Sequence, residues 1–168
     1  MKHTHQGFTL VELLAVLAII GLIGTLAGVA VGSARAKQRD ATRLSHVRQL
    51  QSALEDYFLE NNRYPEGQTL PLGYGQADCL DAKGFQSSCD AAAPNVLMRT
   101  VPAGLSAGLK HLSSCGEASD ALCYSQGEEG RSYTVQFELE NPVVLTELAE
   151  GLNCATPEGM KPGVCKGL

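Results

Sequence analysis

The stretch Gln6-Gly7-Phe8-Thr9-Leu10-Val11-Glu12-Leu13-Leu14-Ala15-Val16 decides the fold of the N-terminal part of this chain. It opens an apolar run over residues 8–31, in which Glu12 is the one charged side chain. As a helix this run would be about 36 Å long, enough to cross the hydrocarbon core of a bilayer. A secretory signal would show a small-residue cleavage site after its apolar core, and none follows here. We therefore expect the apolar run to stay with the protein.

A helical pattern continues beyond the apolar run. Apolar residues recur at three- and four-residue steps from Leu44 to Phe58, and the first proline is Pro65. Asn61-Asn62 before Tyr64-Pro65 is a plausible helix stop. These features predict one helix from Phe8 to about Asn61, roughly 80 Å long, with its first half in lipid. Its second half would lay an apolar stripe on a globular domain, with the other sides filled by Arg43, Arg48, Gln49, Ser52, Glu55, Asp56 and Glu60.

The remainder of the chain is rich in loops. Residues 133–139 alternate strictly between apolar and polar side chains, which predicts a strand. Residues 122–125 are expected to pair with it across a glycine-bearing turn at 126–131. Residues 143–150 are ambiguous between strand and short helix, and residues 95–112 could contain a short helix. The expected fold class is α+β, a long helix packed on a small antiparallel sheet, in which Tyr133, Val135, Phe137 and Leu139 would meet Leu50, Leu54 and Phe58.

Six cysteines lie in the second half of the chain, at Cys79, Cys89, Cys115, Cys123, Cys154 and Cys165. An even number of cysteines in a small loop-rich domain behind a membrane segment favours disulfides and an oxidising compartment. Metal-ligand spacings such as CxxC or HxxxH are absent. Six cysteines allow many pairings. Pairing of sequence neighbours, Cys79 with Cys89, Cys115 with Cys123 and Cys154 with Cys165, is one of the arrangements that stay open.

Charge is unevenly distributed along the sequence. The formal net charge is −5, so a nucleic-acid partner is not expected. A basic block follows the apolar run and contains Arg35, Lys37, Arg39, Arg43 and Arg48.

Residues 7–14, Gly-Phe-Thr-Leu-Val-Glu-Leu-Leu, resemble the N-terminal signature of type IV pilins and of the pseudopilins of type II secretion. The signature is a short leader ending in glycine, then phenylalanine, then an apolar run with glutamate as the fifth residue after the cleavage point. Ser33-Ala34-Arg35-Ala36-Lys37, Leu54-Glu55-Asp56-Tyr57-Phe58 and Asn61-Asn62-Arg63-Tyr64-Pro65 are similar to the major pseudopilin. The resemblance covers about the first 65 residues.

The resemblance implies a processing and assembly pathway. A membrane prepilin peptidase would cut after Gly7 and methylate the new amino group of Phe8. The long helices would form the core of a helical filament, assembled through an inner-membrane platform by a cytoplasmic ATPase. A lone acid in lipid is costly and usually has a partner. We expect Glu12 to pair with the Phe8 amine of a neighbouring subunit and to set its register, with an acid that reaches the head groups as the alternative.

Glycines recur along one face of the predicted membrane helix, at Gly21, Gly24, Gly28 and Gly32. Small residues at four-residue steps allow close helix packing, although glycine is also common in membrane helices generally. Many members of the resembled family carry a proline inside this helix, and this chain has none there. Glycine could substitute for it, or the helix could stay continuous.

Two signals in the sequence disagree on the orientation of the helix in the membrane. The positive-inside rule would place the basic block in the cytoplasm. The cysteines and the resemblance place the leader there instead, and we follow them. The basic block would then contact outer-leaflet head groups, or acids such as Glu55 and Asp56 of neighbouring subunits, or simply solvent.

The sequence shows no catalytic constellation, so we expect a protein that is not an enzyme. Asp78, Asp81 and Asp90 raise the question of calcium in the head, but the spacing of a calcium loop is missing and an ordinary polar loop is preferred. No other cofactor is expected.

The expected organisation is a leader at residues 1–7, a membrane or filament-core helix at 8–32, an amphipathic helix half at 33–62 and a globular head at 63–168. The resemblance predicts a structural filament subunit, anchored once in the inner membrane with a cytoplasmic N-terminus and later part of a filament in the periplasm or at the cell surface. Its expected partners are copies of itself, related pilins, the peptidase, the assembly platform and lipids. The alternative is a single-pass anchored binding domain that does not polymerise.

Overall fold

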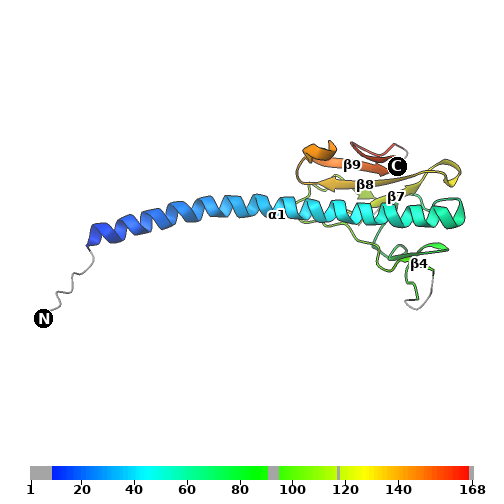
Figure 1. The fold of residues 1–168 in the computed structure, drawn as a ribbon, viewed down its shortest axis with the longest axis horizontal. Helices are drawn as coiled ribbons and strands as arrows, with labels where there is room; N and C mark the ends of the chain where they lie inside the picture. Colours follow the sequence, from blue (N-terminus) through cyan, green and yellow to red (C-terminus); the bar gives the residue numbers. More distant parts are fainter. Residues whose placement is uncertain (1–8, 91–94, 117, 167–168) are drawn as a thin grey trace. The chain divides into compact units, whose positions relative to one another are not determined.

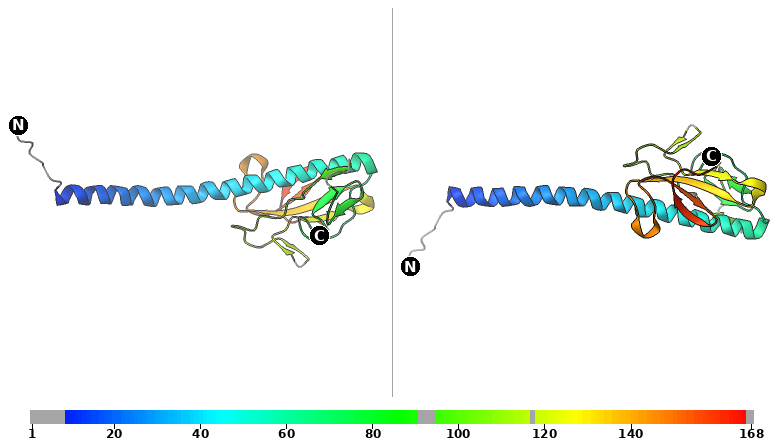
Figure 2. Two further views of the ribbon diagram at one scale, coloured as in Figure 1. Left: turned by 90° about the horizontal axis from the view of Figure 1, so that it is seen from below. Right: turned by 90° about the horizontal axis from the view of Figure 1, so that it is seen from above.

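A computed structural model describes residues 9–90, 95–116 and 118–166 of this chain, except for the side chains of Val29 and Ser114. The chain divides into two compact units, Met1–Arg35 and Ala36–Leu168. Each unit is described by itself below. Figures 1 and 2 show the ribbon from three directions.

The helix α1 spans Leu10–Asn61, close to the predicted range. It contains no proline, so the backbone ladder is not interrupted. At its end Asn62 takes a left-handed backbone conformation (φ 57°), and its N–H donates to the Phe58 carbonyl at 2.8 Å. Asparagine tolerates this conformation and commonly closes a helix in this way. The predicted stop at Asn61-Asn62 is therefore confirmed.

The main sheet of the second unit has five antiparallel strands in the order β1-β7-β8-β9-β10. Its strands are β1 (Leu70–Pro71), β7 (Cys123–Gln126), β8 (Tyr133–Leu139), β9 (Gly151–Thr156) and β10 (Gly159–Pro162). Strand β8 and its hairpin with β7 confirm the prediction. The β9–β10 hairpin lies in the segment that sequence reasoning treated only as a C-terminal tail. In Figure 1 β7, β8 and β9 lie on one side of the helix.

Two smaller sheets complete the second unit. One has the order β3-β2-β4, formed by β2 (Cys79–Asp81), β3 (Gly84–Gln86) and β4 (Val96–Met98). The other pairs β5 (Ser114–Cys115) with β6 (Ala118–Ser119). Short 3-10 turns occur at η1 (Glu128–Gly130) and η2 (Val144–Thr146).

One expectation needs correction, and one ambiguity is resolved. The helix suggested within residues 95–112 was wrong, because this segment forms β4 and then extended loop over its described part. The ambiguous segment at 143–150 is a loop that contains η2 and is closed by a bridge between Val143 and Leu148.

The core of the second unit lies between one face of α1 and the main sheet. Val47, Leu50 and Leu54 are fully buried on the helix, and Phe58 packs at the edge of the same cluster. The sheet contributes the alternating residues of β8, as predicted: Tyr133, Val135, Phe137 and Leu139. Burial of these side chains is the main favourable contribution to the stability of this unit.

The second face of β8 is also buried, which the alternating pattern did not predict. Gln136 and Glu138 are 5% and 3% exposed. Glu138 accepts backbone N–H bonds from Lys110 and Leu112 at 2.7 and 2.9 Å, and Gln136 accepts one from Cys165 at 3.3 Å. The polar side chains of β8 therefore hold a covering loop and the C-terminal tail, instead of facing solvent.

Three disulfides join sequence neighbours: Cys79–Cys89, Cys115–Cys123 and Cys154–Cys165. This is the local pairing that the sequence left open among the alternatives. Each bond closes a short loop, with separations of 10, 8 and 11 residues. Cross-links of this kind supplement the modest core of a small domain.

Candidate functional site

The first candidate site is the apolar part of α1. Leu10, Ile20 and Leu26 are 74%, 61% and 66% exposed, and other large apolar side chains of residues 10–31 are exposed on every side of the helix. Within the described part of the chain, α1 is the one helix long and apolar enough to cross a membrane. A helix that is apolar all round needs a lipid or protein environment.

The Thr25 hydroxyl in this segment is satisfied within the helix itself. Thr25 donates its hydroxyl to the Leu22 carbonyl at 2.8 Å. Such a bond back to the preceding turn removes an unpaired hydroxyl from an apolar environment. Thr25 therefore adds little to the cost of burying this face in lipid or in a filament.

Glu12 lies in the first turn of α1 and forms a capping box with Thr9. The Thr9 backbone N–H and hydroxyl both donate to Glu12 Oε2 at 2.8 Å, and the Glu12 N–H reaches Thr9 Oγ1 at 3.3 Å. The signal for this cap is the spacing Thr-x-x-Glu, which the sequence reasoning missed. In the described part of the chain Glu12 Oε1 has no hydrogen bond, so this oxygen is available to a further donor.

The predicted cleavage and methylation residues, Gly7 and Phe8, lie outside the described residues. The predicted packing glycines lie within them. A Cβ atom added at Gly21, Gly24, Gly28 or Gly32 would meet nothing within 4 Å. The helix thus presents these glycines as an open strip where another helix could approach, which stays a prediction.

The second candidate site is an ion cluster that joins α1 to the loops of the second unit. Arg43 is 3% exposed and donates to Asp40 Oδ1 at 2.8 Å and Glu140 Oε1 at 2.6 Å. It also donates to the backbone carbonyls of Leu105 and Ala107. One guanidinium therefore connects the helix with two loops that are far away in sequence.

Asp40 and Glu140 complete this cluster. Asp40 is 3% exposed and accepts the backbone N–H groups of Glu140 and Asn141, both at 2.9 Å. Arg39 donates two hydrogen bonds to the Glu140 carboxylate. The Arg39 hydrogen bond, and then Arg43, hold the pKa of Glu140 below its ordinary value despite its partial burial.

This cluster corrects the expected role of the basic block. Sequence reasoning placed Arg43 on the outer side of the helix, whereas it is buried, and the acid that Arg39 and Arg43 bind is Glu140 of the same chain. Likewise Glu55 accepts the Tyr64 hydroxyl at 3.0 Å within the chain. Partners about a hundred residues away leave no trace in local periodicity, so this cluster could not be predicted from the helix alone.

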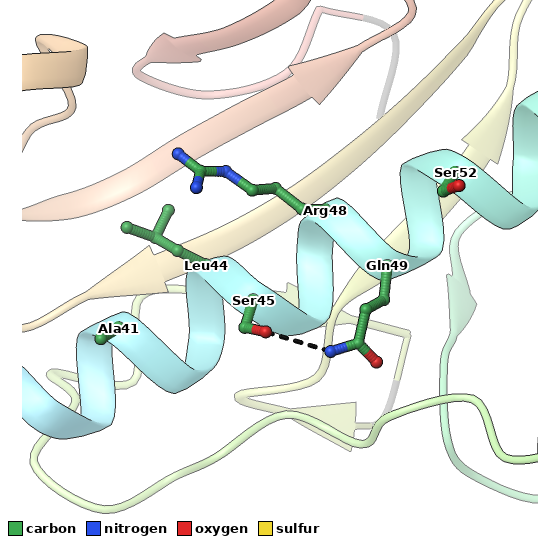
Figure 3. A pocket seen from close by; sticks show the side chains of 6 residues that line it. All are labelled: Ala41, Leu44, Ser45, Arg48, Gln49 and Ser52. Atoms are coloured by element: carbon green, nitrogen blue, oxygen red, sulfur yellow. Dashed lines mark hydrogen bonds between the residues drawn. The ribbon is translucent and has the colours of Figure 1, made fainter.

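The rest of the basic block is solvent-facing. Arg48 is exposed and forms no ion pair within the described residues. It borders a shallow hollow of about 460 Å³, lined by Ala41, Leu44, Ser45, Arg48, Gln49 and Ser52. Figure 3 shows these residues on α1, with the Gln49 amide donating to the Ser45 hydroxyl at 3.0 Å. The hollow has one cation and two serine hydroxyls, and its lining includes no acid or histidine that could act as a general base beside them.

The described residues contain no group of three His, Cys, Asp or Glu side chains that could hold a metal ion. Among the carboxylates considered for calcium, Asp81 accepts the backbone N–H of Lys83 at 2.8 Å, as in a polar turn. His111 Nδ1 lies 2.6 Å from Asp120 Oδ2, a pair that sequence reasoning did not identify. Both residues take a left-handed backbone conformation, and no nucleophile is hydrogen-bonded to this pair in the described residues.

Comparison with known proteins gives the following matches. The profile of the Prokaryotic N-terminal methylation motif matches residues 2–28. The chain is 34% identical over 64 residues to the type II secretion system core protein G of Aeromonas hydrophila, which covers 38% of this chain and 45% of that protein. It is 31% identical over 88 residues to the type IV major fimbrial protein FimA of Dichelobacter nodosus, which covers 52% of this chain and 53% of that protein.

A third relative is the core protein G of Pectobacterium carotovorum subsp. carotovorum, 35% identical over 63 residues, which are 38% of this chain and 40% of that protein. The chain thus spans about half the length, or less, of the curated relatives it matches. No solved structure matches it.

Proposed function

We propose that the protein is a structural subunit of a helical filament, either a type IV pilus or a type II secretion pseudopilus, because its N-terminal segment matches the methylation motif and is similar to that of the pilin and pseudopilin relatives. The observation that supports this most directly is the helix at residues 10–31, apolar and exposed on every side, with Glu12 as its one charged side chain. In a filament, the same segments of neighbouring subunits would cover these faces.

The proposed maturation begins with cleavage after Gly7 by a prepilin peptidase. The same enzyme then methylates the new amino group of Phe8. Both steps are supported by the match of the methylation motif over residues 2–28. The result is a cationic amine at the start of an apolar helix, four residues before Glu12.

The proposed role of Glu12 is to set the register between subunits. Its Oε2 caps the helix through Thr9, and its Oε1 is left for an additional donor. The Phe8 amine of a neighbouring subunit would neutralise the carboxylate in the apolar filament core. A buried ion pair adds little net stability, but loss of one partner leaves a buried charge unpaired. Glu12 would therefore select the one axial position at which both charges are paired.

Before assembly, we propose, the subunit is stored in the inner membrane by its apolar helix, with its N-terminus in the cytoplasm and its head outside. Three disulfides in the second unit support an oxidising compartment for the head. The proposed partners are copies of this chain and related pilins, the peptidase, membrane lipids, and an assembly platform with a cytoplasmic ATPase. The chain itself is proposed to be structural and not catalytic, with no nucleic-acid partner.

Substitution of Glu12 tests the assembly role. Glu12→Leu removes the intramembrane charge, so the chain should insert at least as well, yet filaments sheared from the cells should be lost or disordered in electron micrographs. Val11→Leu, a matched change beside it, should leave filaments intact. If Glu12→Leu formed filaments as abundant and as regular as those of the unchanged chain, the register role would be wrong. If the unchanged chain formed none beside a working assembly machine, it would be an anchored binding domain.

A further inference from the structure

The loop that follows β8 presents two adjacent apolar side chains to solvent. Val144 is 87% exposed and Leu145 is 97% exposed, both within η2. The loop is not loosely attached, because Leu148 is buried and the backbone groups of Val143 and Leu148 pair at 2.9 Å. A closed loop thus holds Val144 and Leu145 outward, where their apolar surface is in contact with water. Such exposed apolar side chains mark a surface that binds a partner or a membrane.

The same loop borders a groove against the first turns of α1 in this unit. The cavity has a volume of about 330 Å³. Its walls are largely apolar and are formed by Lys37, Asp40, Ala41, Leu44 and the loop residues Asn141 to Leu145. In Figure 2 the loop, coloured orange, lies beside the part of α1 that belongs to this unit.

The charges around this groove favour an anionic ligand. Asp40 is occupied by Arg43 and the N–H groups of Glu140 and Asn141, and Glu140 by Arg39 and Arg43. Lys37 is exposed and makes no ion pair within the described residues. Glu147 is exposed on the same loop, and its negative charge weakens the attraction of the groove for an anionic ligand. The groove therefore offers one available cation beside an apolar wall.

The position of Lys37 in the sequence brings this surface close to the membrane. Lys37 lies six residues beyond Val31, the last residue of the apolar run, so the chain can carry it no more than about 20 Å from Val31. In a chain anchored through that run, Lys37 would lie at the depth of the phospholipid head groups. A basic residue next to exposed apolar side chains is the composition that binds the boundary between head groups and acyl chains.

We propose that Val144, Leu145 and the groove beside them form a docking surface for the anionic phospholipids of the membrane in which the subunit is stored. Lys37 binds a lipid phosphate, and Val144 and Leu145 insert among the upper acyl carbons. This inference rests on the proposed membrane storage of the subunit. The head would then be held against the bilayer by two attachments, the apolar helix and this loop.

The test uses the full oxidised chain reconstituted at low protein-to-lipid ratio in vesicles of phosphatidylglycerol and phosphatidylethanolamine. A polarity-sensitive fluorophore is attached to the introduced cysteine in each of three separate variants, Leu145→Cys, Leu59→Cys and Leu17→Cys. Leu59 is a matched control, because it is 81% exposed but lies 22 residues beyond Lys37 on α1. Leu17 reports insertion of the apolar run. Lipids with a quencher in the upper acyl chain then report contact with the bilayer.

We expect quenching of the probes at positions 145 and 17 and none at position 59. Lys37→Gln or omission of phosphatidylglycerol should reduce quenching at position 145, and Glu147→Gln should increase it. Quenching at position 17 alone would overturn the docking surface while leaving the proposed function intact. No quenching at any position would overturn membrane storage itself. A blue shift at position 145 that appears only at high protein density would assign the surface to a second copy and contradict a lipid ligand.

Discussion

Arg43 Nη1 lies 2.6 Å from Glu140 Oε1, so that the helix and the end of strand β8, 97 residues apart in sequence, are joined by an ion pair. Both side chains are largely buried, and Asp40 and Arg39 extend the pair into a cluster. Such a cluster fixes where the strand end lies along the helix.

Arg43→Ala should destabilise the second unit by about 3–5 kcal/mol, because it leaves the buried Asp40 and Glu140 without a counter-charge. It also removes donors from two loop carbonyls. The matched control is Arg48→Ala, an exposed residue of the same helix, which should change stability by less than about 0.5 kcal/mol. Denaturant unfolding of the full chain in detergent micelles, followed by near-ultraviolet circular dichroism, measures both. Equal effects of the two substitutions would contradict the role of the cluster.

The ion cluster also predicts acid sensitivity. Arg39 and Arg43 lower the pKa of Glu140 in the folded protein. A carboxyl group whose pKa is lower when folded stabilises the fold above its unfolded pKa of about 4.3, and this contribution is lost as the pH falls through the folded pKa. Glu140→Gln should therefore reduce stability at pH 7 and flatten its dependence on pH below about 4.3. Unfolding midpoints measured as a function of pH for the unchanged protein and for Glu140→Gln would reveal this contribution. Parallel curves for the two proteins would contradict it.

Gly108→Ala should disturb the same cluster from the opposite side. Gly108 has φ +80°, and an added Cβ would approach Glu140 Oε2 to 2.0 Å. Gly75 is a control that separates strain from collision, because its φ is +57° but a Cβ there meets nothing within 4 Å. Gly75→Ala should cost about 1 kcal/mol for the backbone conformation alone. Gly108→Ala should reduce the free energy of unfolding by clearly more. An equal loss of stability at both positions would show that the Glu140 side chain moves away from the added Cβ without disturbing the cluster.

Helix packing in the proposed filament predicts a difference between two faces of α1. Gly28→Leu fills the open glycine strip and should block close approach of another helix, while the monomer has free space there. Ala30→Leu adds similar bulk about half a turn round the helix and should be tolerated better. Filament yield relative to membrane-inserted subunit measures the difference. Equal yields would remove the glycine strip from the assembly interface.

The Cys154–Cys165 disulfide should stabilise the main sheet from its C-terminal side. It closes a loop with a separation of 11 residues, for which chain entropy predicts about 3 kcal/mol. Replacing both cysteines with alanine also frees the tail whose Cys165 N–H binds Gln136. Unfolding and hydrogen exchange of β8 and β9 should detect the loss. Unchanged protection of the backbone amide at position 165 in this variant would show that the tail holds its place without the cross-link.

Local patterns predicted the parts of this fold that depend on local chemistry. The α1 helix, the β7–β8 hairpin and the Asn62 stop follow from periodicity, alternation and turn residues. The helix expected within 95–112 failed because that segment is held by β2 and by the buried Glu138, both outside its own sequence. The Arg43 cluster was missed for the same reason. Charged residues on a helix indicate a solvated face until a distant acid is brought against them.

Of the residues predicted to act in assembly, the structure describes Glu12 and the glycine strip. It adds to Glu12 a helix-capping bond with Thr9, which follows from Thr-x-x-Glu spacing and was predictable. The exposed pair Val144 and Leu145 was not predictable. Two apolar residues in a loop indicate a core contact as readily as a surface.

The most direct test of the central claim is the intact mass of the protein purified from its native membrane, before and after reduction. Our account predicts a chain that starts at Phe8, carries one added methyl group, and gains on reduction the hydrogens of three disulfides. A chain that retains Met1 to Gly7, in cells whose prepilin peptidase is active, would contradict the filament subunit and leave a membrane-anchored binding domain.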